Sequence, residues 1–309
     1  MILTVTLNST IDRTYIVDNF RVDGIQQAQS SNILPGGKGI NVGRVFKELG
    51  GRVLLTGFVG GHNGDFIREN TQSESLAADF IRVSGESRTC IKIVDPANKT
   101  QTEISEIGPF IFADEIGRFR QKFENLIKGM DYIVLSGSIP PGVPDSIYRE
   151  LIEVAHRCDV RCMLDTNGIP LAEGIKANPS VIKPNIHELS ELVGKQLDTL
   201  EEAVRAAKEI VTNGIEIVIV TFGRDGAIVV TANEVWRSIP PSIIYVSAVG
   251  SGDSFGAGFL YALVQGESIA DALRLGTAAG AANAATPSSG VCRKDDILLC
   301  VDQTMVSAL

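Results

Sequence analysis

The chain has 309 residues, of which 44% are hydrophobic and 21% charged, and its formal net charge is −9 at pH 7. This is the composition of an ordinary globular protein, and the length allows one large domain with an ample core. The negative charge argues against nucleic acid as a partner, and no run approaches the roughly 20 apolar residues of a membrane span.

The cysteines and histidines do not form a recognisable metal site. The five cysteines lack CxxC spacing, and the three histidines are dispersed along the chain. An odd number of cysteines fits free thiols in a reducing compartment, so we expect a cytoplasmic protein. The first residues, MILTVTLNST, predict a strand rather than a targeting segment.

The first third of the chain predicts a buried strand, a glycine-rich helix start and several polar strands. We expect residues 8–12 to form a loop at the carboxyl end of the strand 2–7, where ligands bind in open α/β sheets. The polar strands predict a small separate sheet that serves as a lid, with approximate bounds 12–34 and 88–107. The other elements expected here are a helix from about 42 to 49, a strand at 53–59, a helix at 64–78, a strand at 80–83 and a hairpin of 88–94 with 101–106.

From residue 113 onwards, helical and strand patterns alternate with short connections. Such alternation predicts βαβ units and a parallel sheet with helices on both faces, in one domain with no linker or repeat. The Ala- and Gly-rich helix near the C-terminus predicts tight packing rather than a cofactor site. The expected helices are 113–128, 144–158, 200–212, 254–264, 269–285 and one after 293, and the expected strands are 132–135, 161–164, 181–182, 217–221, 227–231 and 234–237.

The segment VGSGDSFGAGF near the C-terminus carries the strongest chemical signal. Gly250, Ser251 and Gly252 lead into a helix, whose first turn has free N–H groups and the positive end of the dipole, so an anion can approach the backbone closely. A carboxylate beside an anion site is electrostatically unfavourable, so Asp253 in that turn makes sense if it acts on the group that attacks a phosphate. The alternative is a plain helix start in which Asp253 complements the dipole, and this segment alone does not separate the two.

A second group of motifs follows other predicted strands. Neither PGGKGIN nor the segment at Gly250 fits the Walker A or GxGxxG fingerprint. In KPNIHE, Asn185 and Glu188 face the same way in a helix start and could hold magnesium through water, although a capping box explains the same spacing and is favoured on spacing alone. The segments TFGRDG and SGSIPPG also follow predicted strands. Each could be either a ligand-binding loop or a simple turn.

Taken together, PGGKGINV, SGSIPPGV, KPNIHEL and VGSGDSFGAGF resemble the successive signatures of PfkB-type carbohydrate kinases, over nearly the whole chain. The opening TLNSTID and the hairpin segments GESRTCIKI and TEISEIGP resemble the branch that contains the bacterial 1-phosphofructokinases and tagatose-6-phosphate kinases. Ser9 replaces the usual proline, and Ser247-Ala248 replaces the Asp-Thr of many members. The resemblance implies a ribokinase-like, Rossmann-type α/β/α sandwich with a β-lid that often forms a dimer clasp.

The resemblance also assigns roles to individual residues. Asp253 matches the general base, and Gly250, Ser251 and Gly252 match the anion hole for the transferring phosphoryl group. The remaining matches are Asp12, Gly37, Lys38 and Asn41 for the sugar; Arg88 and Ser138 for its existing phosphate; Lys183, Asn185 and Glu188 for nucleotide phosphate and Mg²⁺; and Thr221, Gly223, Gly226 and Ser247, with Gly250 and Gly252, for the adenine nucleotide.

We therefore expect an ATP- and Mg²⁺-dependent kinase that converts a ketohexose monophosphate, fructose 1-phosphate or tagatose 6-phosphate, into a 1,6-bisphosphate. A kinase of an unphosphorylated sugar or nucleoside is the nearest alternative, but two cations at the acceptor site, Lys38 and Arg88, suit a dianionic phosphate better. A non-catalytic sugar-phosphate sensor would not need Asp253. We also expect a homodimer formed through the lid, with no nucleic-acid or membrane partner.

Overall fold

The computed structural model describes all 309 residues, and its central feature is an 11-stranded sheet. Neighbouring strands follow the order β15-β14-β13-β12-β11-β10-β9-β1-β4-β5, with β6 paired to β4. The strands from β12 to β4 run parallel, and β13, β14 and β15 extend the sheet antiparallel at one edge. The strands are β1 (Ile2–Thr6), β4 (Val53–Gly60), β5 (Ala77–Ala78), β6 (Ile81–Val83), β9 (Tyr132–Ser136), β10 (Arg161–Asp165), β11 (Val181–Ile182), β12 (Ile217–Thr221), β13 (Ala227–Val230), β14 (Val235–Ile239) and β15 (Met305–Ala308).

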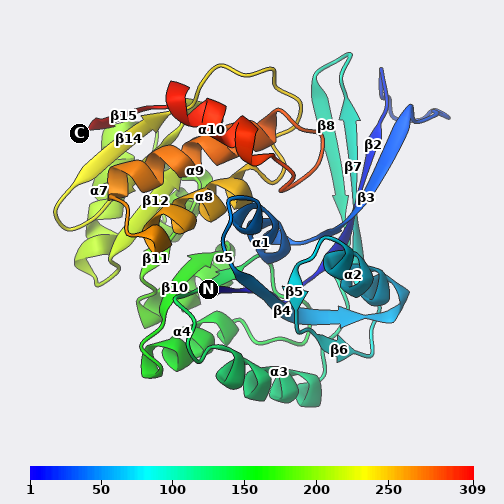
Figure 1. Ribbon diagram of the computed structural model, residues 1–309, viewed down its shortest axis with the longest axis horizontal. Helices are drawn as coiled ribbons and strands as arrows, with labels where there is room; N and C mark the ends of the chain where they lie inside the picture. Colours follow the sequence, from blue (N-terminus) through cyan, green and yellow to red (C-terminus); the bar gives the residue numbers. More distant parts are fainter.

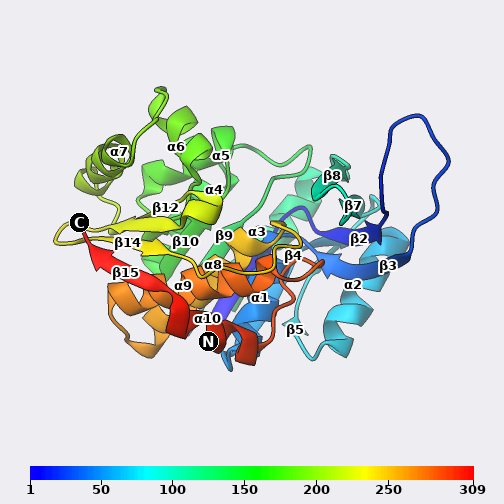
Figure 2. The same ribbon diagram turned by 90° about the horizontal axis from the view of Figure 1, so that it is seen from above.

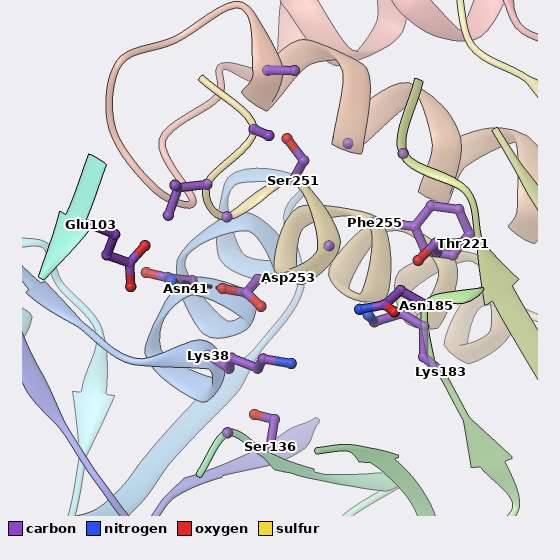
Figure 3. Close-up of a pocket in the computed structure, with 18 of the residues that line it drawn as sticks. Lys38, Asn41, Glu103, Ser136, Lys183, Asn185, Thr221, Ser251, Asp253 and Phe255 are labelled. Atoms are coloured by element: carbon purple, nitrogen blue, oxygen red, sulfur yellow. Dashed lines mark hydrogen bonds between the residues drawn. The ribbon is translucent and has the colours of Figure 1, made fainter. Parts of the chain in front are cut away.

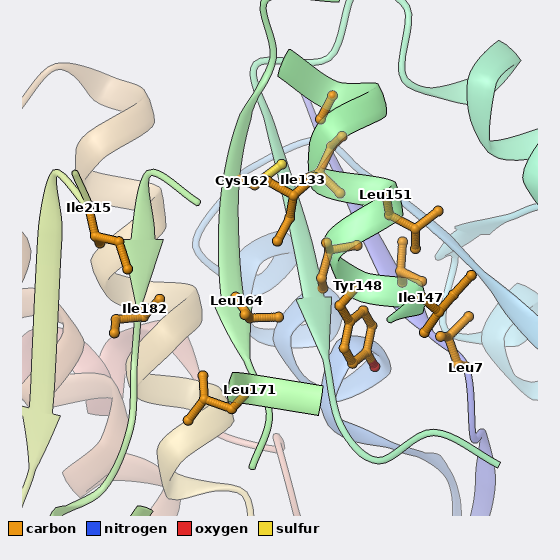
Figure 4. Close-up of a cluster of buried hydrophobic side chains, with 14 of the residues drawn as sticks. Leu7, Ile133, Ile147, Tyr148, Leu151, Cys162, Leu164, Leu171, Ile182 and Ile215 are labelled. Carbon is orange, nitrogen blue, oxygen red and sulfur yellow. The ribbon is translucent and has the colours of Figure 1, made fainter. Parts of the chain in front are cut away.

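Helices cover both faces of this sheet (Figures 1 and 2). One layer packs on the apolar core shown in Figure 4, and the other layer packs on a second core across the sheet. The first layer contains α3 (Ala113–Leu126), α4 (Ile147–Arg157), α5 (Gly168–Gly174), α6 (Ile186–Val193) and α7 (Leu200–Thr212), and the second contains α1 (Lys38–Glu48), α2 (Gly61–Ser73), α8 (Ser251–Gln265), α9 (Ile269–Ala284) and α10 (Lys294–Gln303).

The two cores exist because successive side chains of a strand point to opposite faces of the sheet. In β9, Ile133 and Leu135 belong to the core under α3–α7, whereas Tyr132 and Val134 belong to the core under α8 and α9. A strand that is buried on both faces needs a continuous apolar run, which is the pattern that predicted a parallel sheet. The expected ribokinase-like α/β/α sandwich is therefore confirmed.

A second, four-stranded sheet stands beside the main one (Figure 1). Its order is β3-β2-β7-β8, with β2 parallel to β7 and the outer pairs antiparallel. We call it the lid sheet, and the idea that it moves stays a prediction. Its strands are β2 (Thr10–Ile16), β3 (Ser30–Gly36), β7 (Arg88–Asp95) and β8 (Thr100–Ser105).

Two local predictions were wrong. Residues 10–12 belong to β2 rather than to a loop, because β2 pairs with β3 and β7 along its whole length. The helix expected at 64–78 ends at Ser73, since Ser75 takes a left-handed conformation (φ 54°) and the chain then forms β5. The helix α5 and the edge strand β15 were not anticipated.

No helix of the structure combines the length and the apolar character that crossing a membrane would need.

Candidate active site

A cavity of about 1220 Å³ lies at the carboxyl ends of the parallel strands, beside the lid sheet. It brings together all but one of the residues that the sequence singled out. The predicted residues that line it are Asp12, Gly37, Lys38, Asn41, Arg88, Ser138, Lys183, Asn185, Glu188, Thr221, Gly223, Gly226, Gly250, Ser251, Gly252 and Asp253.

The first turn of α8 forms an anion cradle. Its N-cap, Gly250, has a left-handed conformation (φ 81°), and no side chain caps the helix. The backbone N–H groups of Gly252 and Asp253 make no hydrogen bond within the protein. A Cβ atom on Gly250 would lie 2.7 Å from the Cα atom of Ser289, so both the backbone conformation and the packing require glycine here. Two unpaired N–H groups at the positive end of a helix fit a phosphoryl group.

The side chain of Asp253 is buried beside this cradle and faces the cavity (Figure 3). Its Oδ2 atom accepts a hydrogen bond of 2.8 Å from Asn41 Nδ2. Burial raises the pKa of Asp253 above its usual value, and the nearby Lys38 ammonium partly opposes that effect. A desolvated carboxylate is a stronger proton acceptor than one in water, as a general base requires.

Two lysines face the same cavity and share one carboxylate. Lys38 Nζ lies 2.9 Å from Asp165 Oδ1, and Lys183 Nζ lies 3.0 Å from Asp165 Oδ2. The second contact is an ion pair whose alignment does not make it a hydrogen bond. Asp165, at the carboxyl end of β10, thus holds one cation from α1 and one from the segment after β11.

The charges in this triad stabilise one another. Burial opposes the charged form of Lys38, but attraction to Asp165 and Asp253 and the hydrogen bond to Asp165 together outweigh burial and raise the pKa of Lys38. Burial likewise opposes ionisation of Asp165, but Lys183 and Lys38 outweigh it and lower the pKa of Asp165. The triad therefore carries two positive charges and one negative charge, a net charge that favours an anion in the cavity.

Lys183 reaches the cradle because α8 has small residues along its path. A Cβ atom on Gly252 would lie 3.4 Å from Lys183 Nζ, and one on Gly256 would lie 3.7 Å from Lys183 Cε. Residues 252 and 256 are one turn apart on the same helix face, so the lysine stem runs along that face. The ammonium consequently lies beside Gly252, in the first turn of α8.

The lid side of the cavity carries a second buried ion pair. Lys92 Nζ on β7 lies 2.5 Å from Asp12 Oδ2 on β2 and donates a hydrogen bond of 2.7 Å to Ser289 Oγ. Lys92 and Asp12 are both buried. Asp12 is therefore held rigidly at the sugar end of the cavity.

A polar pocket lies at the base of the lid sheet. Arg88 Nε donates to the carbonyl oxygen of Asn8 over 3.1 Å, and Asn8 Nδ2 donates to Ser138 Oγ over 3.2 Å. The Oδ1 atom of Asn8 is buried without a partner. Arg88, Asn8 and Ser138 all line the cavity, so one cation and several polar groups gather at this end.

The segment after β11 contains the capping box that the spacing favoured. Asn185 Oδ1 accepts hydrogen bonds from the N–H groups of His187 and Glu188, both 2.9 Å long, and Glu188 Oε2 accepts one from Asn185 N. The side-chain oxygen of Asn185 is thus committed to the helix, whereas the second carboxylate oxygen of Glu188, a residue of the cavity lining, makes no hydrogen bond within the protein. One free carboxylate oxygen fits a Mg²⁺ ion that keeps most of its water shell, and no cluster of three metal-ligating side chains is present.

Ser247 is the predicted residue that does not line the cavity. It is buried, and its hydroxyl donates a hydrogen bond of 2.8 Å to Gln101 Oε1 on β8 while accepting one from Val249 N. Contrary to expectation, α9 contributes Thr277, Gly280 and Ala281 to the cavity wall, in addition to packing tightly on α8.

Sequence reasoning missed Asp165, Lys92 and Asn8. Asp165 directly follows a predicted strand, as the other site loops do, and this position was the available signal. The role of Lys92 depends on pairing between β2 and β7, which local sequence does not reveal.

Comparison with known proteins agrees with this geometry. The model of the pfkB family carbohydrate kinase matches residues 1–296, so the chain belongs to that family. It is 36% identical over 303 residues to a 1-phosphofructokinase of Borreliella burgdorferi, covering 97% of both chains. These similarities confirm the expected class of enzyme, an ATP-dependent sugar-phosphate kinase.

Solved structures are similar over nearly the whole chain. A possible 1-phosphofructokinase from Thermotoga maritima superposes with a TM-score of 0.93 at 29% identity, covering 100% of this chain and 99% of that one. Phosphofructokinase-2 from Escherichia coli, in complex with substrates and products, superposes with a TM-score of 0.93 at 28% identity, covering 97% and 98%. The latter protein has also been solved as a tetrameric inhibited form, with a TM-score of 0.90 at 28% identity over the same shares of the two chains.

Proposed function

We propose that this carbohydrate kinase transfers the γ-phosphoryl group of ATP to a hydroxyl of fructose 1-phosphate or tagatose 6-phosphate, giving a 1,6-bisphosphate. The observation that carries the proposal is the buried Asp253 carboxylate beside two unpaired N–H groups at the start of α8. A base next to an anion cradle is the arrangement that phosphoryl transfer to an alcohol needs.

The two ends of the cavity fit the two ends of a ketose phosphate. We place the reacting hydroxyl at Asp253, the ring hydroxyls near Asp12, Gly37 and Asn41, and the existing phosphate at the pocket of Arg88, Asn8 and Ser138. The name of the Borreliella relative supports a phosphorylated ketose as acceptor. One pocket can hold the phosphate of either substrate, so the proposal includes both.

The nucleotide occupies the opposite side in this proposal. Its γ-phosphoryl group lies over the cradle of Gly250, Ser251 and Gly252, with Lys183 beside it. The adenine nucleotide extends toward the loop of Thr221, Gly223 and Gly226 and the small residues of α9. Ser247 acts there only indirectly, because it is buried behind the cradle.

Asp253 accepts the proton of the acceptor hydroxyl as the phosphoryl group moves. The transition state is largely loose, so most of the catalysis comes from positioning and from charge neutralisation by the cradle, Lys183 and Lys38. Lid contacts keep water away from the phosphoryl group. Glu188, held in place by Asn185 through the capping box, would hold a hydrated Mg²⁺ ion, and the ion would neutralise charge on the nucleotide phosphates.

A kinase of unphosphorylated sugars or nucleosides is the second candidate. It is less favoured because a neutral acceptor gains little from Arg88 and Lys38 in a protein whose net charge is −9. A sensor without activity would gain nothing from a buried carboxylate that is costly to ionise.

The lid sheet has an outer face that supports a homodimer. Tyr15, Ile91, Ile93 and Ile104 alternate with the cavity-facing residues of their strands, and Ile104 is 58% exposed. We propose that this outer face, defined by these four residues, packs on a second copy of the chain. We also propose that the protein is cytoplasmic, because free cysteines stay reduced in that compartment.

A coupled assay of ADP release tests the proposed function. The panel contains fructose 1-phosphate, tagatose 6-phosphate, fructose 6-phosphate, fructose, ribose and adenosine, each with MgATP. We expect the highest kcat/KM for fructose 1-phosphate or tagatose 6-phosphate, and a kcat lower by about a hundredfold or more in Asp253→Asn prepared in parallel. A preference for a neutral acceptor would overturn the substrate assignment, and no activity with any acceptor would overturn the kinase assignment.

A further inference from the structure

The segment Ser288–Gly290 lies between the lid sheet and the anion cradle. On its lid side, Ser289 Oγ accepts the hydrogen bond of Lys92, and Ser288 Oγ accepts one of 2.9 Å from Asn32 Nδ2 on β3. On its other side, the backbone of Ser289 and Gly290 packs directly against Gly250, where a Cβ atom would lie 2.7 Å from either residue. The segment therefore contacts both the lid sheet and the cradle.

Asn283 on α9 fastens this segment to the cradle. The side chain of Asn283 is completely buried. Its Oδ1 atom accepts a hydrogen bond of 2.8 Å from Gly290 N, and its Nδ2 atom donates to the carbonyl oxygen of Val249 over 2.8 Å and to Ser251 Oγ over 3.3 Å. One amide thus fixes both the segment and the residues on either side of Gly250.

These contacts form a continuous connection between the lid side of the cavity and the anion cradle. It runs from Asp12 through Lys92 to Ser289, then through Gly290 and Asn283 to the cradle at Ser251. Every link is a hydrogen bond or an ion pair except the peptide bond that joins Ser289 to Gly290. Lys92 and Asn283 are buried, where hydrogen bonds and ion pairs are strong and their groups are costly to leave unpaired. Asp12 is on the lid sheet, so this connection joins the lid sheet to the cradle.

We propose that Ser289 and Asn283 are positioning residues that couple the docked lid to the shape of the anion cradle. In this role they set how well the N–H groups of Gly252 and Asp253 align with the transferring phosphoryl group, without touching either substrate. The inference rests on the proposed function, because it concerns the phosphoryl-transfer step.

Ser289→Ala tests the connection with little disturbance. It removes the hydroxyl that Lys92 binds but leaves the ion pair of Lys92 with Asp12 in place. We expect kcat to fall about three- to tenfold, the effect of one lost hydrogen bond, while KM for the ketose phosphate and for ATP stays within about twofold. Ser288→Ala is the matched control: it removes the neighbouring hydroxyl and one lid contact but no link of the connection, and its kcat should stay within about twofold of the parent value.

A double-mutant cycle then separates coupling from two local defects. Asn283→Asp keeps the size of the side chain and the acceptor for Gly290 N but removes the donor to Val249 and Ser251. If both residues act through one connection, Ser289→Ala should lower kcat less in the Asn283→Asp background than in the parent chain. Thermal unfolding of each variant verifies that the protein is folded.

The outcomes are distinct. Additive effects on kcat, an unchanged kcat in Ser289→Ala, or an increase in KM instead of a decrease in kcat would each overturn the inference while the kinase assignment stands. An inactive parent enzyme in the substrate panel would instead overturn the proposed function.

Discussion

Asn41 Nδ2 donates a hydrogen bond of 2.8 Å to Asp253 Oδ2, and so joins the helix α1 to the helix α8 inside the cavity. Both helices start in glycine-rich loops at the carboxyl edge of the sheet. The amide donor orients the carboxylate and leaves its other oxygen toward the cavity. The proposed sugar loop thus positions the proposed base, which ties acceptor binding to catalysis.

Asp253→Asn should lower kcat by about a hundredfold or more, because the amide cannot accept the proton of the acceptor hydroxyl. The binding of ATP should change little, since the cradle uses backbone groups. Steady-state kinetics gives kcat, and equilibrium titration with a fluorescent ATP analogue gives the affinity. Turnover close to that of the parent enzyme would mean that Asp253 only complements the helix dipole.

The same substitution should stabilise the fold at neutral pH. Burial raises the pKa of Asp253, so ionisation of this carboxyl destabilises the folded state. The destabilisation is absent below the pKa of the carboxyl in the unfolded chain, grows between the unfolded and the folded pKa, and is complete above the folded pKa. We expect the Asp253→Asn variant to melt a few degrees higher than the parent at pH 8, and the difference to shrink toward pH 5. A variant that melts lower than the parent at pH 8 would contradict the pKa direction.

Asp165→Asn should have the opposite effect on stability. Attraction to Lys183 and Lys38 outweighs burial and lowers the pKa of Asp165 in the folded state. The ionised carboxylate therefore stabilises the fold at every pH above the usual pKa of about 3.9, and this stabilisation is lost only as the pH falls through the pKa of the folded state. We expect the free energy of unfolding to decrease by about 3–5 kcal/mol at pH 7, because two cations lose their shared partner.

Urea unfolding at pH 7 and pH 5 measures this effect. The decrease should be the same at both pH values, since both lie above the usual pKa of an aspartate. Asp145→Asn, at an exposed position without an ion pair, is the control and should change stability by less than about 0.5 kcal/mol. A decrease that disappears by pH 5 would show that Asp165 is not held ionised by the lysines.

Apart from β5 and β15, the sequence predicted the strands of the main sheet well, because most of them are short apolar runs followed by glycine or polar residues. For the same reason it placed most cavity residues, which occupy the first positions after such runs. It missed the use of Asp165, since nothing local to that strand end shows that Lys38 and Lys183 converge on one carboxylate from two other elements.

The errors elsewhere have a similar physical origin. The strand β2 begins at Thr10 because its partners β3 and β7 supply hydrogen bonds there, against the turn preference of Asn8 and Ser9. Ser247 carries a nucleotide-site assignment by resemblance, but the fold directs its hydroxyl to Gln101 of the lid sheet. In both places tertiary contacts override the local pattern.

Ile104→Asp should weaken self-association. Ile104 is 58% exposed on the outer face of the lid sheet, and a charge buried in an apolar interface is costly to desolvate. We expect a dimer for the parent chain and a monomer for the variant by sedimentation velocity at micromolar concentration. Ile169→Asp, which changes a 62% exposed isoleucine on α5, should leave the dimer intact. An Ile104→Asp variant that stays dimeric would place the interface elsewhere.

Arg88→Ala should raise KM for the ketose phosphate by about an order of magnitude or more, equivalent to roughly 1.5–3 kcal/mol for a charge-assisted hydrogen bond. The preference for the phosphorylated over the free ketose should narrow, because only the phosphorylated substrate loses a partner. Arg88 also binds the carbonyl oxygens of Asn8 and Glu106, so its loss loosens the base of the lid sheet as well.

Glu106→Ala separates these two effects. Glu106 Oε2 accepts a hydrogen bond of 2.7 Å from Thr89 N at the same base of the lid sheet, and Glu106 does not line the cavity. This variant should disturb the lid without changing the ratio of kcat/KM for fructose 1-phosphate to that for fructose. A narrowed ratio in Arg88→Ala alone therefore assigns Arg88 to the acceptor phosphate. An unchanged ratio in a folded Arg88→Ala enzyme would exclude that assignment and favour an acceptor without a phosphate.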